Sequence, residues 1–296
     1  MLFCFTVSVC LFMIVNSNRI QRQGFLFCAL LFTALQSCMA QPRDRFSSAE
    51  ELLGHTEAVI EIQLKTPNDI VPIKDSIVKP YQYDNGISLA SLRTKEKKQK
   101  FFDMILPSIL IAREALEKKY KAVDMIRVKQ SKGLVLSEFE TNFLAAQMKA
   151  CKAKTIDDLL LRLRTHPTSI VMAQAALESG WGSSRFYLQA NNIFGVHSFN
   201  SSEARVPASV KKDGKTSYVK KYDCIAASIE GYFKTLARGP YSNFRRERAK
   251  TDDPLQLIQY LTRYSVLKEE YVRRLSSVIV SNNLQQYDSY QLGEVE

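Results

Sequence analysis

The chain has 296 residues, of which 46% are hydrophobic and 24% charged, and its formal net charge is +11. These values allow one good-sized domain with a proper core, and no internal repeat or low-complexity tract stands out. The three histidines, His55, His166 and His197, are too scattered for a zinc site or a Ser–His–Asp triad, which excludes both classes as starting hypotheses.

Residues 1–40 have the features of an export segment. Two apolar runs, 1–16 and 25–35, are separated by two arginines, and each is shorter than the roughly 20 residues of a membrane-spanning helix. Read from Met13, the segment has a basic region, an apolar core of signal-peptide length and a small-residue end. We therefore expect export from a start at Met13, with a two-pass membrane hairpin as the alternative.

Two processing sites fit the end of that segment. The sequence LQSC at 35–38 resembles a bacterial lipobox, which predicts lipidation of Cys38. An ordinary cleavage site after Ala40 would instead release Gln41. Either way we expect an exported chain, either free in the periplasm or attached to the membrane by a lipid anchor or an uncleaved N-terminal segment. Beyond this region only Cys151 and Cys224 remain, and whether they form a disulfide stays open.

Residues 41–94 predict a tether with little regular structure. Pro67, Pro72, Pro80 and the turn at 84–86 interrupt the segment, and we expect part of it to pack on the following domain. Removing residues 1–40 takes away only two arginines, so the exported chain stays basic and attracts polyanions. Outside the cytoplasm these are cell-wall peptides and membrane headgroups, so we expect no nucleic-acid partner, and we expect a monomer.

From residue 95 the hydrophobic pattern becomes helical. Apolar residues between Phe101 and Leu116 recur at helical spacing, although Pro107 predicts a kink or a break. Two further helices are expected at 137–151 and 156–164. These apolar stripes predict core packing and imply no cofactor.

The next helix is expected to begin at Pro167 and Thr168 and to end near Glu178. Its apolar residues fall at near-helical spacing, and Gly180 and Gly182 follow. Because glycine readily adopts the left-handed geometry that ends helices, these two glycines predict the C-terminus. Glu178 is therefore expected on the last helical turn.

That position favours a protonated carboxyl group at Glu178. Helix C-termini favour cations, and burial beside Trp181, the only tryptophan, would remove water; both effects raise the pKa of a carboxyl group. A carboxylic acid that keeps its proton near neutral pH is suited to general acid catalysis. The alternative is a solvated surface glutamate, which is what a glutamate near a helix end usually is.

Aromatic and amide side chains surround Glu178 in the sequence. They are Trp181, Phe186, Tyr187, Asn191, Asn192 and Phe194. Aromatic rings stack on sugar faces and amides bond to sugar hydroxyls, so this composition predicts a carbohydrate-binding cleft.

The remaining chain predicts a hairpin followed by helices. The hairpin is expected within 203–222, where an Asp-Gly pair separates strand-like runs. Helices are expected at 223–236, at 241–249, from Pro254 after an acidic N-cap, and at 271–279.

Two blocks of the sequence resemble one enzyme family. AQAALESGWGSSRF (173–186) followed by NNIFGVHSF (191–199), and YDCIAASIEGYFKTLARGPYSNFRRER (222–248), resemble glycoside hydrolase family 73, the bacterial peptidoglycan N-acetylglucosaminidases, and more narrowly its Bax-type members. The resemblance implies a mainly α fold, a lysozyme-like α domain with a small β-hairpin lobe, over residues 95–288.

The resemblance also implies roles for individual residues. Glu178 matches the catalytic acid, and Tyr222 and Tyr241 match tyrosines near the cleft. Related enzymes place a second carboxylate in the β-lobe, where Glu203 is the candidate that would activate water. Because Bax-type members do not hold that acid at a fixed place, substrate assistance by the N-acetyl group, with Tyr241 or Tyr222 near it, is the alternative.

We therefore expect a glycosidase that cleaves the β-1,4 bond after N-acetylglucosamine in peptidoglycan glycan strands, with no metal and no organic cofactor. Trp181, Asn191, Asn192, Phe194 and Tyr222 are expected to contact the glycan. Three alternatives remain open: a muramidase or lytic transglycosylase on the same fold, a non-catalytic peptidoglycan-binding protein, and a membrane-anchored scaffold.

Overall fold

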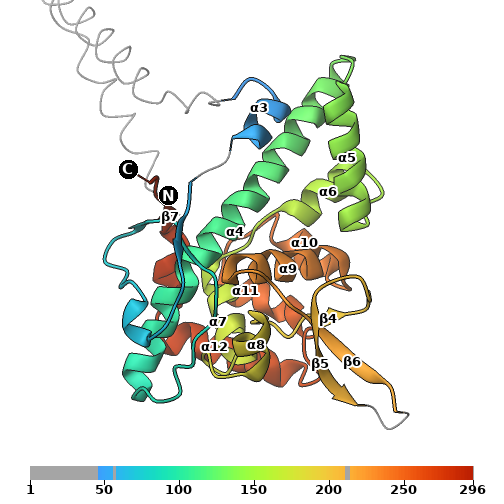
Figure 1. Ribbon diagram of the computed structural model, residues 1–296. Coiled ribbons are helices and arrows are strands. Elements are labelled where there is room, and N and C mark those ends of the chain that lie inside the picture. The colour runs from blue at the N-terminus through green and yellow to red at the C-terminus, as the bar shows by residue number, and fades with distance from the viewer. Residues whose placement is uncertain (1–45, 56–57, 211–213, 296) are drawn as a thin grey trace, which may run out of the picture. The chain divides into compact units, whose positions relative to one another are not determined.

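A helix of 38 residues, α4 (Thr94–Ser131), is the element against which much of the domain packs (Figure 1). Residues 101–110 of this helix are all buried, as expected for a core helix that is covered on every side. Pro107 lies inside the buried stretch and the helix is continuous across it, so the predicted break does not occur. The computed structural model describes residues 46–55, 58–210 and 214–295.

The other helices follow the predicted order. Their bounds are α3 (Ala49–Gly54), α5 (Glu138–Cys151), α6 (Ile156–Leu163), α7 (Thr168–Glu178), α8 (Arg185–Ala190), α9 (Ile225–Arg238), α10 (Ser242–Glu247), α11 (Pro254–Leu257) and α12 (Glu269–Ser281), with 3-10 turns η2 (Pro67–Asp69), η3 (Ile258–Leu261) and η4 (Leu284–Ser289). Within the described ranges, no helix combines the length and apolar character needed to cross a membrane. The predicted export segment, Cys38 included, lies outside those ranges.

The sequence signals for helix ends act as expected. Ser137 and Glu140 form a reciprocal capping box at the start of α5, and Asp253 accepts the first N–H groups of α11. Cys151 lies in a small apolar cluster between α4, α5 and α6, whereas Cys224 is the N-cap of α9. Both cysteines are free thiols, so the disulfide that the sequence left open is absent.

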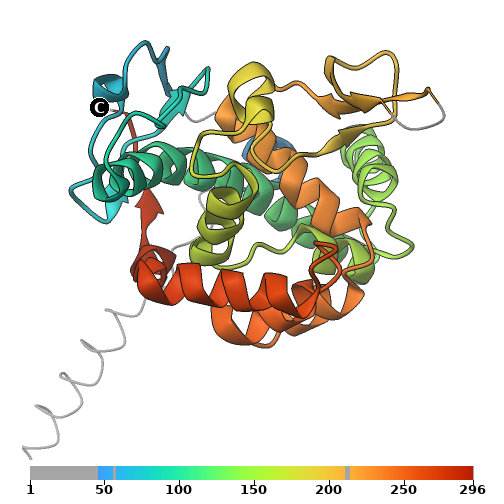
Figure 2. The same ribbon diagram turned by 90° about the horizontal axis from the view of Figure 1, so that it is seen from below.

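Helix α7 packs between α4 and α12 (Figure 2). Its first turn is held from η4, because the Asp288 carboxyl group accepts bonds from the Ser169 N–H at 2.7 Å and from the Ser169 hydroxyl at 2.8 Å. An acidic partner at a helix N-terminus is favourable. The helix that carries Glu178 is therefore fixed by elements from the last thirty residues of the chain as well as by α4.

The segment predicted as a tether packs on the domain. It contains strands β1 (Ile60–Ile62), β2 (Ile77–Val78) and β3 (Tyr81–Tyr83), and β1 pairs in parallel with β3. Strand β2 pairs in parallel with the last strand, β7 (Gln291–Leu292). The segment contributes five buried side chains to the main core: Leu64, Ile70, Val78, Tyr83 and Leu89. Its role as a spacer from the membrane stays a prediction.

The β-lobe is a three-stranded antiparallel sheet in the order β4-β6-β5. Its strands are β4 (His197–Ser198), β5 (Arg205–Val210) and β6 (Thr216–Lys220). Residues 211–213 at the tip of the hairpin lie outside the described ranges, but the pairing of β5 with β6 confirms the predicted hairpin. The architecture is therefore mainly α with a small β-hairpin lobe, as predicted.

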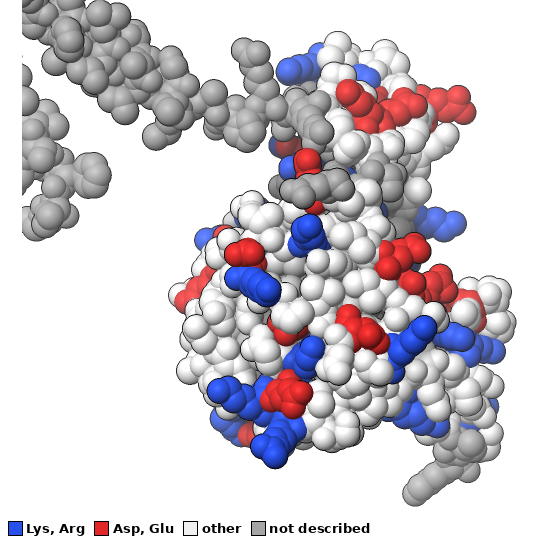
Figure 3. Space-filling view, turned by 60° about the vertical axis from the view of Figure 1, so that its left-hand side comes forward, with Lys and Arg blue, Asp and Glu red and all other residues white. Residues whose placement is uncertain are grey.

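One face of the described protein carries charged side chains of both signs (Figure 3). On the face shown in Figure 3, basic and acidic side chains are interspersed rather than gathered by sign. Some charged side chains are paired along a helix, as in α12, where Arg273 and Arg274 pair with Glu270. This face therefore lacks the single basic stripe that typifies a nucleic-acid-binding surface.

Candidate active site

Helix α7 ends in a tight turn directly after Glu178. The Trp181 N–H donates to the Ala176 carbonyl at 2.9 Å, and the Gly180 N–H donates to the Leu177 carbonyl at 3.4 Å. This pair of bonds is a Schellman C-cap, and the φ angle of 57° at Gly180 is the left-handed geometry that the motif needs. The predicted helix end is confirmed, and Glu178 is the last residue of the helix.

Glu178 is half-buried at this helix end, so its carboxyl group is partly shielded from water. Burial raises its pKa above the ordinary value of 4.5, while a hydrogen bond with the Tyr271 hydroxyl partly opposes the rise. Desolvation disfavours the charged form, whereas a donor to the carboxylate favours it. The balance is a raised pKa, which is the direction that a general acid requires.

Four tyrosines from different elements lie near this carboxyl group. They are Tyr232 on α9, Tyr241 before α10, Tyr264 after η3 and Tyr271 on α12, here called the tyrosine cluster. Burial raises the pKa of each hydroxyl, and the negative charge of Glu178 raises it further. The rings of Tyr264 and Tyr271 stack at 5.6 Å, and Tyr241 lies 6.2 Å from Tyr264. The sequence predicted only Tyr241 of these four.

Trp181 packs against α4. Its indole makes edge contacts with Phe101 at 5.8 Å and Phe102 at 5.5 Å, and Lys98 Nζ lies 4.8 Å from the ring centre. The structure thus gives Trp181 a packing role at the turn, and stacking on a sugar stays a prediction.

The two asparagines hold the frame around the helix end. Asn191 Nδ2 donates to the carbonyls of Asp84 and Tyr222 at 2.9 and 3.0 Å, and its oxygen accepts from the Gly86 N–H at 2.9 Å. Asn192 is fully buried and bonds through both ends of its amide to the backbone of Val196. These contacts argue against the predicted bonding to sugar hydroxyls, because the amide groups already have partners inside the protein.

Phe194 and Tyr222 have different surroundings. Phe194 is 5% exposed and stacks on Tyr232 at 4.3 Å, so it belongs to the core beneath the tyrosine cluster. Tyr222 lies over Gly231 of α9, where a side chain on the glycine would collide with the ring. Within the described residues, the buried Tyr222 hydroxyl has no hydrogen-bond partner. A buried polar atom of that kind calls for an explanation, and a ligand group is one.

Glu203 lies in the β-lobe between β4 and β5. One of its carboxylate oxygens is 2.6 Å from Lys220 Nζ, and the other accepts from the Ser198 hydroxyl at 2.7 Å. Burial raises the pKa of Glu203, but these two partners outweigh it, so the net pKa is lowered. The negative charge of Glu203 also raises the pKa of the Tyr222 hydroxyl. The structure therefore groups Glu203 with Tyr222, and Glu178 with Tyr241.

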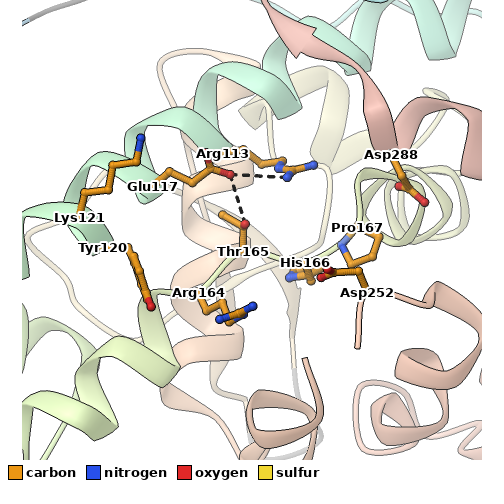
Figure 4. Close-up of a pocket in the computed structure, with 10 residues that line it drawn as sticks. All are labelled: Arg113, Glu117, Tyr120, Lys121, Arg164, Thr165, His166, Pro167, Asp252 and Asp288. Atoms are coloured by element: carbon orange, nitrogen blue, oxygen red, sulfur yellow. Dashed lines mark hydrogen bonds and ion pairs between the residues drawn. The ribbon is translucent and has the colours of Figure 1, made fainter. Parts of the chain in front are cut away.

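A hollow lies at the other end of α7, away from Glu178. It has a volume of about 510 Å³, and Figure 4 shows its mixed lining of Arg113, Glu117, Tyr120, Lys121, Arg164, Thr165, His166, Pro167, Asp252 and Asp288. These residues precede or flank the start of α7, roughly 16 Å along the helix from Glu178. Glu117 bonds inside the hollow to Arg113 and Thr165. The hollow does not include the predicted catalytic residues.

Among the described residues, no group of three or more His, Cys, Asp or Glu side chains is arranged to hold a metal ion. The groups present at the end of α7 are a carboxyl group with a raised pKa and phenolic hydroxyls. Such a set can donate a proton and hydrogen bonds to a bound sugar.

Comparison with known proteins gives a consistent result. Residues 153–284 match the Glucosaminidase family, described as mannosyl-glycoprotein endo-beta-N-acetylglucosaminidase. Protein bax of Escherichia coli (strain K12) is 34% identical over 131 residues, which are 42% of this chain and 46% of that protein. Exo-glucosaminidase LytG of Bacillus subtilis (strain 168) is 26% identical over 133 residues, 40% of this chain and 45% of that one. The matches thus span less than half the length of both relatives.

A solved structure also resembles the chain. The catalytic domain of the autolysin Auto from Listeria monocytogenes is 26% identical, with a TM-score of 0.35, and the match covers 56% of this chain and 97% of that one.

Proposed function

Because residues 153–284 form a domain of the mannosyl-glycoprotein endo-beta-N-acetylglucosaminidase family, a family of glycoside hydrolases, we propose that this chain hydrolyses the β-1,4 bond after N-acetylglucosamine in peptidoglycan. The observation that carries the proposal is Glu178, a partly shielded carboxyl group with a raised pKa at the exit of α7. It lies in the segment that matches the family, within reach of the Tyr271 hydroxyl.

In this proposal Glu178 is the general acid. Its protonated carboxyl group gives a proton to the glycosidic oxygen as the bond to the sugar breaks, and water completes the hydrolysis at the sugar carbon. The negative charge of Glu178 raises the pKa of the Tyr241 hydroxyl, so the two groups lie close together. In the proposed mechanism this hydroxyl stabilises the Glu178 carboxylate or the substrate. No metal or organic cofactor takes part in this scheme.

Glu203 is proposed as the residue that activates water. Its lowered pKa keeps it ionised, which is the state that a general base needs, although the pairing with Lys220 weakens its basicity. Substrate assistance by the N-acetyl group, with Tyr222 or Tyr241 beside it, is the alternative. Tyr222 is favoured as a substrate contact because its buried hydroxyl lacks a partner within the described residues.

The proposed place of action is outside the cytoplasmic membrane. The apolar N-terminal sequence supports export, and the name of one relative, exo-glucosaminidase LytG, supports a glucosaminide substrate. Lipidation at Cys38 is part of this proposal. We expect the wild-type chain to be labelled by a lipid precursor and the Cys38→Ala variant to remain unlabelled.

Glu178→Gln tests the proposed activity. The amide keeps the shape of the side chain but has no proton to donate, so we expect release of fragments from purified sacculi to fall by about 10²- to 10⁴-fold. The matched control is Glu230→Gln, an exposed glutamate of α9 paired with Lys119, which should digest sacculi at the wild-type rate.

Mass spectrometry of the products identifies the bond that is cut. Reducing N-acetylglucosamine ends are expected. Reducing N-acetylmuramic acid would instead indicate a muramidase, and 1,6-anhydro ends a lytic transglycosylase. Equal digestion by Glu178→Gln and wild type would contradict the proposed role of Glu178.

A further inference from the structure

A buried arginine lies beneath the tyrosine cluster. Arg248 is 2% exposed, and its Nη2 donates to the backbone carbonyls of Leu161 and Arg162 at 3.0 and 3.1 Å. Its Nη1 lies 3.3 Å from Nδ1 of His166, which is also buried. These contacts are fixed by the fold, since the carbonyls belong to the end of α6.

From His166 a chain of hydrogen bonds runs through the core to Glu178. His166 Nε2 lies 2.9 Å from the Tyr232 hydroxyl, and the Tyr232 hydroxyl donates to Gln174 Oε1 at 2.7 Å. Gln174 Nε2 donates to the Tyr271 hydroxyl at 3.0 Å. The Tyr271 hydroxyl in turn lies next to the Glu178 carboxyl group, where it lowers the pKa of that carboxyl as a hydrogen-bond donor does. Gln174 is fully buried and lies one helical turn before Glu178 on α7.

The chemistry of the two ends sets the direction of this chain. An arginine guanidinium can only donate, so His166 Nδ1 must accept. A neutral imidazole then carries its proton on Nε2 and donates it to the Tyr232 oxygen. Burial, followed by the charges of Arg248 and Arg113, lowers the pKa of His166 well below its usual value, so the ring is neutral near pH 7.

Once His166 donates to Tyr232, the direction of each following hydrogen bond in the chain is fixed. The Tyr232 proton goes to the Gln174 oxygen, which turns the amide nitrogen toward Tyr271. The Tyr271 oxygen accepts that N–H, so its own proton points to Glu178. A hydroxyl in water could rotate, but one held between fixed partners cannot.

We propose that the buried arginine and this chain orient the general acid. Because Tyr271 can only donate, the Glu178 oxygen that it contacts stays an acceptor, and the proton used in catalysis resides on the other oxygen. The chain thus selects which oxygen faces the substrate as the acid. Its upstream members are positioning residues: Gln174, Tyr232, His166 and Arg248. The inference rests on the proposed role of Glu178.

The first test measures the tautomer of His166 in the wild-type full chain. The chain has three histidines, so a two-bond ¹H–¹⁵N spectrum resolves each ring, and His55→Gln and His197→Gln assign the third. The expected result near neutral pH is a neutral ring with its proton on Nε2. A proton on Nδ1, or an imidazolium ring, would reverse the first link and overturn the inference.

The second test removes one link. Tyr232→Phe keeps the stacking on Phe194 but deprives the Gln174 oxygen of its donor, so the amide is free to turn and accept from Tyr271. Glu178 then loses a hydrogen bond that lowers its pKa. The groups that face Glu178 are the hydroxyls of the tyrosine cluster, from α9, α10, η3 and α12.

The expected result for Tyr232→Phe is a kcat about tenfold lower with KM unchanged. A general acid works while protonated, so activity falls as pH rises through its pKa. Since that pKa rises in the variant, the alkaline limb of the pH profile should move to higher pH. Tyr83→Phe is the matched control: this tyrosine of β3 is also fully buried, and its hydroxyl accepts from the Val71 N–H at 3.2 Å instead.

The control should lose stability as Tyr232→Phe does, yet keep the wild-type kcat and alkaline limb. Identical kcat and pH profiles in the two variants would refute the positioning role. If Tyr232→Phe does not fold, the tautomer measurement on the wild type still decides. Loss of activity in Glu178→Gln with the wrong His166 tautomer leaves the proposed function standing and the inference refuted. Full activity in Glu178→Gln refutes both.

Discussion

Glu178 and Glu203 are the two glutamates that the sequence selects for catalysis, and they lie in opposite surroundings. Glu178 ends a helix between α4 and α12, where burial raises its pKa and its neighbours are tyrosines. Glu203 lies in the β-lobe, where a lysine and a serine hold its carboxylate and lower the pKa. The same side chain is thus set to hold a proton in one region and to release it in the other.

The contrast shows that the surroundings of each carboxyl group decide its protonation state. On the α side, apolar packing removes water and supplies only uncharged donors, which favours the neutral acid. On the β side, an ion pair at 2.6 Å favours the anion. A glycosidase needs an acid and a base with separated pKa values, and in the proposed mechanism each region supplies one of them.

The largest expected effect concerns whether Glu203 takes part in the reaction. If it activates water, Glu203→Gln should lower kcat by about 10²-fold, measured as fragment release from sacculi. Ser198→Ala is the companion variant, since it removes one partner of Glu203 but leaves the carboxylate. Wild-type kcat in Glu203→Gln would exclude the base role and leave assistance by the N-acetyl group as the route.

The next effect concerns the Tyr222 hydroxyl. Because this buried group has no partner within the described residues, Tyr222→Phe should not lower the free energy of unfolding, and a gain of about 1 kcal/mol is expected. If the hydroxyl binds the glycan, KM should rise about fivefold. A urea unfolding curve and a Michaelis curve together test this. A clear loss of stability with unchanged KM would show that the hydroxyl is a structural group.

The smallest effect is on stability and has opposite signs at the two glutamates. The pKa of Glu178 is higher in the folded protein than in the unfolded chain, so the folded state binds this proton more tightly. The free energy of unfolding therefore falls as the pH rises from the ordinary pKa of 4.5 through the pKa of the folded state. Glu178→Gln should therefore raise the free energy of unfolding at neutral pH by about 0.5–2 kcal/mol.

Glu203 behaves the other way. Its lowered pKa adds stability above 4.5 that is lost as pH falls through the folded pKa, so Glu203→Gln should cost about 0.2–1 kcal/mol at neutral pH. Urea unfolding of both variants at about pH 4 and about pH 7 gives the comparison, because the two differences from wild type should shrink at the lower pH. Changes of the same sign in both variants would contradict it.

Local signals in the sequence were enough for most of the fold. Gly180 after Glu178 predicted the end of α7, Asp253 before Pro254 predicted the start of α11, and the Asp-Gly pair predicted the hairpin. Each of these depends on the backbone preferences of one or two residues. At Pro107 the sequence predicted a kink or a break, and the break does not occur, because burial of the surrounding helix outweighs the loss of one backbone bond.

Contacts between distant residues explain what the sequence did not show. Asn191 and Asn192 look like sugar ligands in a linear reading, and only the fold reveals that their amides bond to the backbone. Within the helix expected at 271–279, the sequence did not mark Tyr271 as a neighbour of Glu178, although the two groups interact. The only signal in the sequence was that Tyr271 carries a polar hydroxyl among the apolar residues of its helix. Which partner it meets depends on how α12 packs against α7.

The pairing of β2 with β7 bears on how the polypeptide matures during translation. Strand β2 (Ile77–Val78) is synthesised early, but its partner Gln291–Leu292 is synthesised near the end of the described chain. In the same way, Glu178 is synthesised before its neighbour Tyr271. A ribosome-bound nascent chain therefore lacks the partner of its acid until residue 271 has emerged. The site is completed only when nearly all of the described chain is free of the exit tunnel.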